Sequence, residues 1–393
     1  MKNVLTILIL VVVCSGRVAS QAISIDFFGE KLRYDYRLPQ PMANAVSVEE
    51  IMAYEARLQH AGLESVVNAL ADYRQKHHPD DWLFYQLVRR VAESLSPKAA
   101  DYTRYTIYKW FLLRESGYDA LLTASENKIL FYIRTDEHIY NIPTRMENGK
   151  SYVCLNYHDY GSIDFEKESF RTVPLPLKPG AIAFSYKIKS LPDFASSAYV
   201  DRSLQFNYYQ SSYKFNIKVN PELGILFRNY PVVDYESYFN IPLSRTTYAS
   251  LIPKLKKNMT GMNQKQGVDY LMRFTRYAFL FQPDTDVFGA EKRLSPEQTL
   301  LYEQSDCEDR AALFFYLVKE IYDLPMLVLA YPHHVSIAVK FDKPVGKHII
   351  YNGSVYSICD PTPQKNDLAL GQPLPALANT PFDIAYAYDP VNQ

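Results

Sequence analysis

Residues 303–320, with the sequence EQSDCEDRAALFFYLVKE, carry a cysteine between acidic residues at the start of a predicted helix. Ser305 or Asp306 can cap this helix, because a short side-chain oxygen accepts from the free N–H groups of the first turn. Cys307 then lies at or next to the first helical residue, where the helix dipole favours a thiolate. The position predicts a nucleophilic cysteine with a lowered pKa; a small buried cysteine that only fills space is the alternative.

Two polar side chains downstream can complete a site with this thiol. MLVLAYPHHVSIAVKF predicts two strands joined near Pro332, and SVYSICDPT predicts another strand that ends in a turn. His334 opens one strand and Asp360 closes the next. A thiol, an imidazole and a carboxylate can act as nucleophile, base and orienting group in acyl transfer. Each residue alone has an ordinary structural explanation, so the prediction depends on all three together.

The two adjacent histidines are separated by strand alternation, since successive side chains of a strand point to opposite faces. His334 shares its face with Ser336 and Ala338, whose small side chains leave room for the cysteine helix. His333 shares its face with Val335, Ile337 and Val339, which are branched apolar residues typical of a hydrophobic core. We therefore expect His334 to be the base, with one ring nitrogen near the sulfur of Cys307 and the other facing the carboxylate.

The elements that must position these groups are predicted from apolar periodicity and capping signals. Residues 263–281 and a short segment that opens at 295 both begin with the pattern of a capping box. KILFYIRT and KSYVCLNY favour strands. Further helices are expected at 46–76, 80–95, 101–115 and from Cys307 onward.

Four short segments in the middle of the chain favour strands: AIAFSYKIKSL, SLQFNYY, SYKFNIKV and GILFRNY. We therefore expect an α+β protein with three domains. These are a helix-rich N-terminal α+β domain at 21–158, a β-rich middle domain at 159–246 and a C-terminal domain at 247–393 that carries the site.

The first twenty residues read as a secretory signal peptide, with a lysine, an apolar stretch and small residues before Gln21. Export to the periplasm or beyond a bacterial cell is expected, and the apolar run is too short for a membrane span. A lipoprotein anchored through Cys14 is the alternative, which Val13 before that cysteine disfavours. The net charge of −1 gives no electrostatic reason to expect nucleic acid as a partner.

Three cysteines remain after cleavage, so at least one thiol is left out of any disulfide within the chain. The sequence contains no C-x-x-C, H-E-x-x-H, Walker A or dinucleotide-binding glycine pattern. We therefore predict neither a metal nor a cofactor. Cys359 adjoins Asp360 but should point the other way and be buried.

Residues 284–363 resemble the bacterial transglutaminase-like superfamily, whose core is related to papain-like cysteine peptidases. The resemblance is carried by SDCEDRAALFFYLV, YPHHVSIAV and SICDPT. It implies a transglutaminase-like C-terminal domain in which Cys307, His334 and Asp360 form the catalytic triad. Ser305 stands where the family often has glycine, and a proline follows Asp-Pro-Thr where the family often has a tyrosine.

The resemblance implies an exported cysteine-dependent acyl hydrolase or transferase that works through a thioester. Its substrates would be peptides or peptide-like amides such as cell-wall stems, with water or an amine as acceptor. The oxyanion hole is expected from the backbone N–H of Cys307 and a second donor, Gln282 or Gln304. A catalytically silent binding or scaffolding protein is the alternative. The sequence gives neither the acceptor nor the oligomeric state.

Residues 101–122 parallel residues 306–329, which suggests an internal repeat. At the same offset, Cys154 corresponds to Cys359. If the repeat is real, the first copy has lost every catalytic group. The positions that would correspond to those of the triad are Tyr102, Lys128 or Ile129, and Leu155. Chance similarity between two amphipathic helices followed by strands is the alternative.

Overall fold

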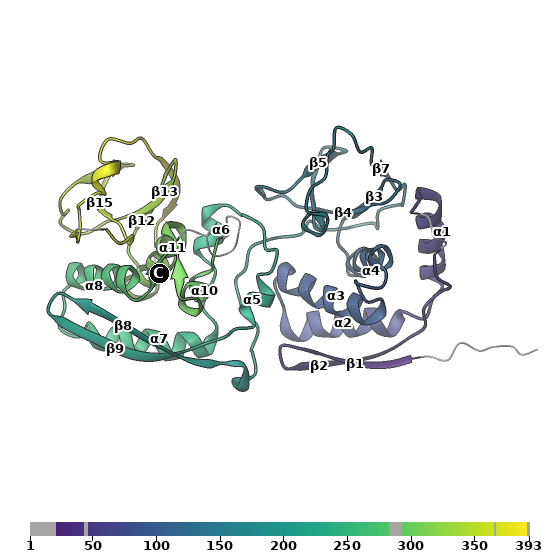
Figure 1. Cartoon of the computed structure of the whole chain (residues 1–393), viewed down its shortest axis with the longest axis horizontal. Coiled ribbons are helices and arrows are strands. Elements are labelled where there is room, and N and C mark those ends of the chain that lie inside the picture. The colour runs from purple at the N-terminus through teal and green to yellow at the C-terminus, as the bar shows by residue number, and fades with distance from the viewer. Residues whose placement is uncertain (1–20, 43–45, 283–292, 365–366, 391–393) are drawn as a thin grey trace, which may run out of the picture.

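The computed structural model describes residues 21–42, 46–282, 293–364 and 367–390, so the expected signal peptide and Cys14 lie outside the described residues. Figure 1 shows two lobes side by side, the first from purple to blue and the second from teal to yellow. Both lobes combine helices with antiparallel sheets, which confirms the α+β class. Within the described ranges, no helix has the length and apolar character needed to cross a membrane.

The N-terminal lobe begins with a hairpin of β1 (Gln21–Phe27) and β2 (Glu30–Tyr36). Alternate residues of both strands are buried, because one face of the hairpin packs on helices and the other meets solvent. The helix expected at 46–76 is two helices, α1 (Val48–Gln59) and α2 (Glu64–His77), separated by residues 60–63. Helices α3 (Asp81–Leu95) and α4 (Tyr102–Glu115) lie close to their expected positions.

A five-stranded antiparallel sheet completes this lobe in the order β5-β6-β4-β3-β7. Every residue of β3 is buried, and β4 is buried except at its last residue, so both read as continuous apolar runs. The strands are β3 (Ala120–Ala124), β4 (Ile129–Arg134), β5 (Thr144–Glu147), β6 (Lys150–Cys154) and β7 (Arg171–Thr172).

The middle of the chain contains fewer strands than expected. Two of the four predicted strand segments form a hairpin of β8 (Val200–Tyr208) and β9 (Ser211–Val219). Residues 181–191 contain only an isolated bridge at Ile182, and 224–230 begins inside helix α5 (Leu223–Leu226). The hairpin packs on helices of the C-terminal lobe. The expected β-rich content of 159–246 is therefore only partly met.

The C-terminal lobe adds helices and a second five-stranded sheet, in the order β14-β15-β13-β12-β16. The helices are α6 (Tyr235–Phe239), α7 (Arg245–Asn258), α8 (Gln264–Tyr277), α10 (Pro296–Leu301) and α11 (Cys307–Tyr322). The strands are β12 (Met326–Tyr331), β13 (His334–Val339), β14 (His348–Tyr351), β15 (Ser354–Cys359) and β16 (Asp383–Tyr388). A parallel pair, β10 (Leu280–Phe281) and β11 (Gln304–Ser305), precedes α11. Short 3-10 helices lie at Tyr157–Tyr160, Ser196–Ala198 and Pro375–Leu377.

The two lobes repeat one arrangement of elements. Each has a hairpin, then helices that pack on it, then a helix that leads into a sheet with its five strands in the same spatial order. Helices α2 and α3 pack on β2 and β1, as α7 and α8 pack on β9 and β8. In Figure 1 the first hairpin lies below α2 and α3, the second lies below α8 and overlaps α7, and each sheet lies above the helices of its lobe.

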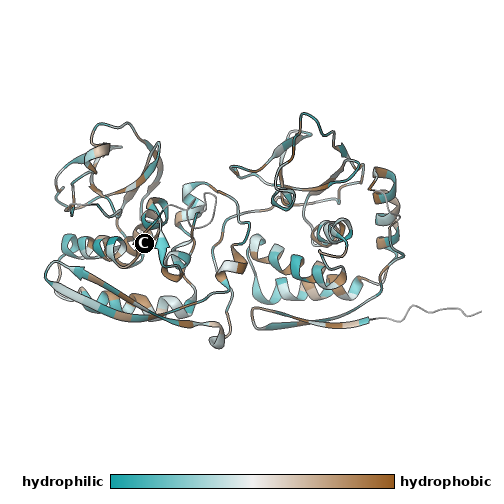
Figure 2. Cartoon of the chain, viewed as in Figure 1, coloured by the Kyte–Doolittle hydropathy of each residue, from teal (hydrophilic) through white to brown (hydrophobic). Residues whose placement is uncertain are grey.

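A single cluster of buried hydrophobic side chains includes residues from both lobes. Helix α5 joins the two parts, since Leu223 and Leu226 are buried in this cluster and the indole Nε1 of Trp82 donates to the carbonyl of Leu226 at 2.8 Å. Figure 2 shows hydrophobic and hydrophilic residues intermixed along the helices of both lobes, as amphipathic helices require. The lobes are therefore joined by core packing as well as by the chain.

Candidate active site

Cys307 is the first residue of α11, as the sequence predicts. Asp306 caps the helix: its Oδ1 accepts from the backbone N–H of Asp309 at 3.1 Å, and Oδ2 of Asp309 accepts from the N–H of Asp306 at 3.4 Å. This reciprocal pair fixes the turn that presents the thiol. Cys307 is partly exposed, whereas Cys154 and Cys359 are buried, and all three thiols are free.

His334 is the first residue of β13, and Asp360 directly follows β15. Nε2 of His334 lies 2.8 Å from Oδ2 of Asp360, with both side chains largely buried. The other carboxylate oxygen of Asp360 accepts from the N–H of Thr362 at 2.9 Å, which fixes its orientation. His333 is exposed in the turn before β13. As predicted, His334 is the histidine that faces the carboxylate, which leaves its Nδ1 for a second partner.

The environment of the thiol differs from the expectation of a lowered pKa. The pKa of the Cys307 thiol is raised to about 12, mainly by burial and then by the carboxylates of Asp306, Glu308 and Asp360, while the N–H of Val335 partly offsets the rise. That N–H belongs to the residue after His334, so the sulfur lies beside the start of β13. The hydrogen bonds of the described residues do not include one between the sulfur and the imidazole. The thiol is therefore protonated at rest.

The packing of β13 corrects the predicted approach of the cysteine helix. Val335, Ile337 and Val339 belong to the main core together with apolar residues of α11, so this is the face that the helix covers. Ala338 lies on the opposite face, in a smaller cluster that includes Leu327. The prediction that the helix lies against the Ser336 and Ala338 face is wrong, because the branched residues supply the apolar surface that buries α11.

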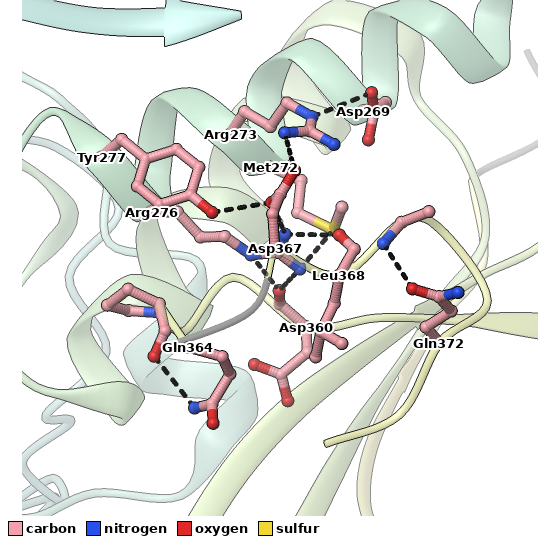
Figure 3. Close-up of polar contacts among 12 residues, drawn as sticks. Asp269, Met272, Arg273, Arg276, Tyr277, Asp360, Gln364, Asp367, Leu368 and Gln372 are labelled. Atoms are coloured by element: carbon pink, nitrogen blue, oxygen red, sulfur yellow. Dashed lines mark hydrogen bonds and ion pairs between the residues drawn. The ribbon is translucent and has the colours of Figure 1, made fainter. Parts of the chain in front are cut away.

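Arg276 of α8 holds the backbone of Asp360 in place. Its guanidinium is buried and donates to the Asp360 carbonyl from Nε at 2.9 Å and from Nη2 at 2.5 Å. Nη1 donates to the carbonyl of Leu368 at 2.5 Å and to Oδ1 of Asp367 at 3.2 Å. Figure 3 shows Arg276 between Asp360 and Asp367. This residue therefore links the end of β15 to the segment that follows it.

Arg310 fixes the start of the cysteine helix in a similar way. This fully buried side chain donates to the carbonyls of Arg276 at 2.6 Å, Phe279 at 3.1 Å and Ser305 at 3.4 Å. The C-terminal end of α8 thus holds both the cysteine turn and the aspartate turn. Neither arginine was identified from the sequence, although a charged residue among the apolar residues of a helix is a signal that points to a buried partner.

The rim of the site carries an ion pair with aromatic partners. Nε of Arg293 donates to Glu308 at 2.7 Å, and its guanidinium lies 4.5 Å from the ring centroid of Tyr235. Gln304 pairs with Leu280 between β11 and β10, and the N–H of Gln282 donates to the carbonyl of Ser305 at 3.4 Å. Both proposed oxyanion donors therefore flank the segment that leads into Cys307.

The first lobe has different side chains at the equivalent positions. Tyr102 is the first residue of α4 and follows the cap Asp101, as Cys307 follows Asp306. Ile129 opens β4, and Leu155 follows β6. The strand register agrees with this correspondence, because Cys154 pairs with Tyr132 as Cys359 pairs with Ile337.

A hydrogen-bonded network occupies this part of the first lobe. The hydroxyl of Tyr102 donates to Oδ2 of Asp159 at 2.8 Å and accepts from Nδ2 of Asn156 at 2.9 Å. Nζ of Lys98 donates to the other oxygen of Asp159 at 2.5 Å. The equivalent positions therefore hold a tyrosine and two aliphatic residues in place of a thiol, an imidazole and a carboxylate.

Comparison with known proteins gives no match to a family model, a curated protein or a solved structure. Across the described ranges, no group of three or more histidine, cysteine, aspartate or glutamate side chains is arranged to hold a metal ion. The functional interpretation therefore depends on the geometry of the thiol, the imidazole and the carboxylate.

Proposed function

We propose that the chain is a cysteine-dependent acyl hydrolase or transferase with a transglutaminase-like C-terminal domain. Cys307 is the nucleophile, His334 the base and Asp360 the orienting group. The observation that carries the proposal is the 2.8 Å contact between Nε2 of His334 and Asp360, next to a helix whose first residue is a cysteine. A buried imidazole and carboxylate beside a partly exposed thiol have the composition of a nucleophilic site.

The contact with Asp360 determines which ring nitrogen of His334 is the donor and which is the base. With Nε2–H donating to the carboxylate, Nδ1 is the nitrogen that accepts a proton. The raised pKa of the Cys307 thiol means that the proton moves when the sulfur attacks, instead of resting on the imidazole beforehand. Asp360 stabilises the imidazolium that forms, and its buried position strengthens this interaction.

The reaction proceeds in two acyl-transfer steps. The sulfur of Cys307 attacks the amide carbon while Nδ1 takes the thiol proton, and the oxyanion is held by backbone N–H groups at the start of α11. The amide C–N bond then breaks, and His334 gives its proton to the leaving amine. A thioester remains on Cys307. Water or an amine attacks the thioester carbon while His334 takes its proton. The C–S bond then breaks, His334 returns the proton to the sulfur of Cys307, and a carboxylic acid or a new amide leaves.

The substrates that suit this chemistry are peptides and peptide-like amides, such as cell-wall stems, outside the cytoplasm. The first lobe is proposed to be a degenerate copy of the catalytic unit. This is supported by the shared strand order and by Tyr102, Ile129 and Leu155 at the three positions that correspond to the triad. Such a copy has no acyl-transfer chemistry of its own.

A catalytically silent binding protein with the same fold is the second candidate function. The observation that favours it is the pKa of Cys307, which burial and nearby carboxylates raise to about 12. This opposes thiolate formation at neutral pH. The two functions differ in one measurable respect, because only the enzyme forms an acyl adduct on Cys307.

The test is the release of amine from a panel of peptide amides, together with intact-mass detection of an acyl adduct. We expect Cys307→Ser and His334→Ala to abolish release, and Asp360→Asn to reduce it by about 100-fold or more while the protein stays folded. The matched control is His333→Ala, which removes the exposed neighbour and should leave release unchanged. Amine release that survives in Cys307→Ser would falsify the proposal.

A further inference from the structure

A cavity of about 570 Å³ lies in the first lobe, away from Cys307. Its walls come from the end of β1, the outer face of α3 and the segment around α5 that joins the lobes. A volume of this size is in the range that holds small molecules and short peptides. The cavity is therefore large enough for a ligand that the chemistry at Cys307 does not explain.

Gln86 of α3 is the strongest sign that the cavity is built for a ligand. Its side chain is more than nine-tenths buried and lines the cavity. Oε1 accepts from Nη1 of Arg89 at 3.1 Å, which sets the orientation of the amide. Nε2 is buried without a hydrogen-bond partner. Buried donors are rarely left unpaired, because burial without a partner costs free energy, so this amide points to an acceptor in a bound molecule.

Three arginines line the same cavity, and none of them has a carboxylate within ion-pair distance among the described residues. Arg89 and Arg90 lie on α3 within one turn of Gln86, and Arg228 follows α5. Among the described residues, none of the three forms an ion pair, although acidic side chains line the cavity. Guanidinium groups next to an amide N–H form a surface that suits a carboxylate, which accepts from both.

Two carboxylates lie together on another part of the wall. Burial raises the pKa of the Glu222 carboxyl, and Asp26 raises it further, so these two groups are close enough to repel each other. Both line the cavity. A cation between them would relieve the repulsion. The wall of the cavity therefore carries both donors and acceptors, and Glu93 of α3 adds a third carboxylate.

We propose that this cavity binds a zwitterionic ligand such as a short peptide, with its carboxylate at Gln86 and Arg89 and its ammonium group at Asp26 and Glu222. The proposal needs no chemistry at Cys307. Its premises are the volume of the cavity, the unpaired amide and the presence of both donor and acceptor groups on the wall. The first lobe then contributes binding, whatever the activity of the second.

The test is calorimetric titration of the full chain carrying Cys307→Ser, which removes turnover. The probes are alanyl-alanine, its C-terminal amide and its N-acetyl form. We expect saturable binding of alanyl-alanine and about tenfold or more weaker binding of each blocked form, since each loses one charged contact. No saturable binding of alanyl-alanine, or equal affinity for all three probes, contradicts the proposal.

Two variants separate a ligand role from a structural one. Gln86→Leu with Arg89→Met should remove the preference for the free carboxylate. Asp26→Asn keeps the contact with the N–H of Gly29. It should lower the affinity for alanyl-alanine to about the affinity that the parent has for the N-acetyl form. The control is Arg57→Gln, which breaks an ion pair with Glu50 outside the cavity and should bind as the parent does. Parent-like discrimination in both test variants would overturn the assignment.

Discussion

The thiol of Cys307 lies among acids, and this sets how it can react. Its pKa of about 12 has burial as the main cause, with Asp306 next, so a helix N-terminus does not by itself make a thiolate. The dipole and the N–H of Val335 are outweighed by desolvation and by like charge. On the proposed mechanism, reaction at neutral pH therefore requires His334 to remove the thiol proton during attack.

Alkylation of Cys307 measures this directly. Because only the thiolate reacts, the rate with iodoacetamide should rise about tenfold per pH unit above neutrality and level off only near pH 12. Cys154 and Cys359 should react more slowly, since both are buried. Peptide mass mapping gives the rate at each thiol. A plateau already present at pH 7 would mean a stable ion pair with His334 and would contradict the raised pKa.

Lys109 is the second residue with an unusual ionisation. Its side chain is buried in α4, with Nζ 4.4 Å from the ring centroid of Tyr105. Burial lowers its pKa to about 7. The unfolded chain, with an ordinary lysine pKa near 10.4, therefore binds the proton more tightly. Below pH 7 the buried lysine lowers the free energy of unfolding the most, and this loss disappears as the pH rises to about 10.

Lys109→Met should therefore stabilise the protein by a few kcal/mol at pH 7 and by little at pH 10. Denaturant unfolding at both pH values measures the difference. Lys214→Met, at an exposed strand position, serves as the control and should give the same small effect at both. A gain from Lys109→Met that does not shrink with rising pH contradicts the assigned pKa.

At the scale of elements, α8 carries the geometry of the site. Its C-terminal carbonyls bind Arg310 of α11, and its own Arg276 binds the turn after β15. The proposed nucleophile and the proposed orienting carboxylate come from different elements, so their separation depends on this helix. A change in α8 should then affect catalysis without touching any reacting group.

Arg276→Met should lower kcat by about tenfold or more with little change in KM, because Asp360 loses its backbone anchor. Arg273→Met is the matched control. Arg273 lies one turn earlier on α8 and bonds Asp269 and Asp367, but does not contact Asp360. Amine release and circular dichroism distinguish the two. Equal loss of activity in both variants would mean that the segment at Asp367, and not the anchor on Asp360, is what matters.

The sequence predicted those elements whose signals are local. Capping boxes at Asn263 and Ser295 appear in the structure as expected, because side chain and backbone satisfy each other within one turn. The strand prediction for GILFRNY was wrong because its run of three apolar residues fits a strand or a buried helical turn equally well, and packing between the lobes selects the turn. The prediction of which β13 face the cysteine helix covers was wrong, because small side chains indicate room on a face but do not show which element fills it.

The candidate site was predictable in part. Cys307, His334 and Asp360 stand at element ends that the sequence marks, and His334 is the histidine that contacts Asp360, as expected. The argument from strand faces that selected His334 was wrong, because α11 covers the Val335 face of β13. Arg276 and Arg310 were missed, because their partners are backbone carbonyls, which leave no trace in residue types. The pKa of Cys307 was misjudged because burial is a property of the folded chain.

For the whole molecule, the junction between the lobes depends on α5. Trp82 is buried on α3 and donates to the carbonyl of Leu226, while α5 also contacts α10 of the second lobe. The two lobes therefore share a core across a short helix that could not be stable by itself. Movement of one lobe against the other must disturb this helix.

Trp82→Phe should increase amide hydrogen exchange in α5, because the Leu226 carbonyl loses its buried donor at a cost of about 1–3 kcal/mol. Trp110→Phe is the matched control. It removes an indole donor to the carbonyl of Ala120 inside the first lobe and should leave exchange in α5 unchanged. If both variants or neither changed exchange in α5, the junction would not depend on Trp82.

Tyr102, at the position that corresponds to Cys307, also bears on how the first lobe could have lost its nucleophile after a duplication. Codons for cysteine and tyrosine differ by a single base, whereas histidine to isoleucine and aspartate to leucine each need at least two changes. On the proposed duplication, a single base change is enough to replace the nucleophile of the first unit by tyrosine. Without a thiol no thioester can form there, so an imidazole and a carboxylate would have no role in acyl transfer. Restoring cysteine at 102 alone would then give an inert thiol, held beside Asn156 and Asp159.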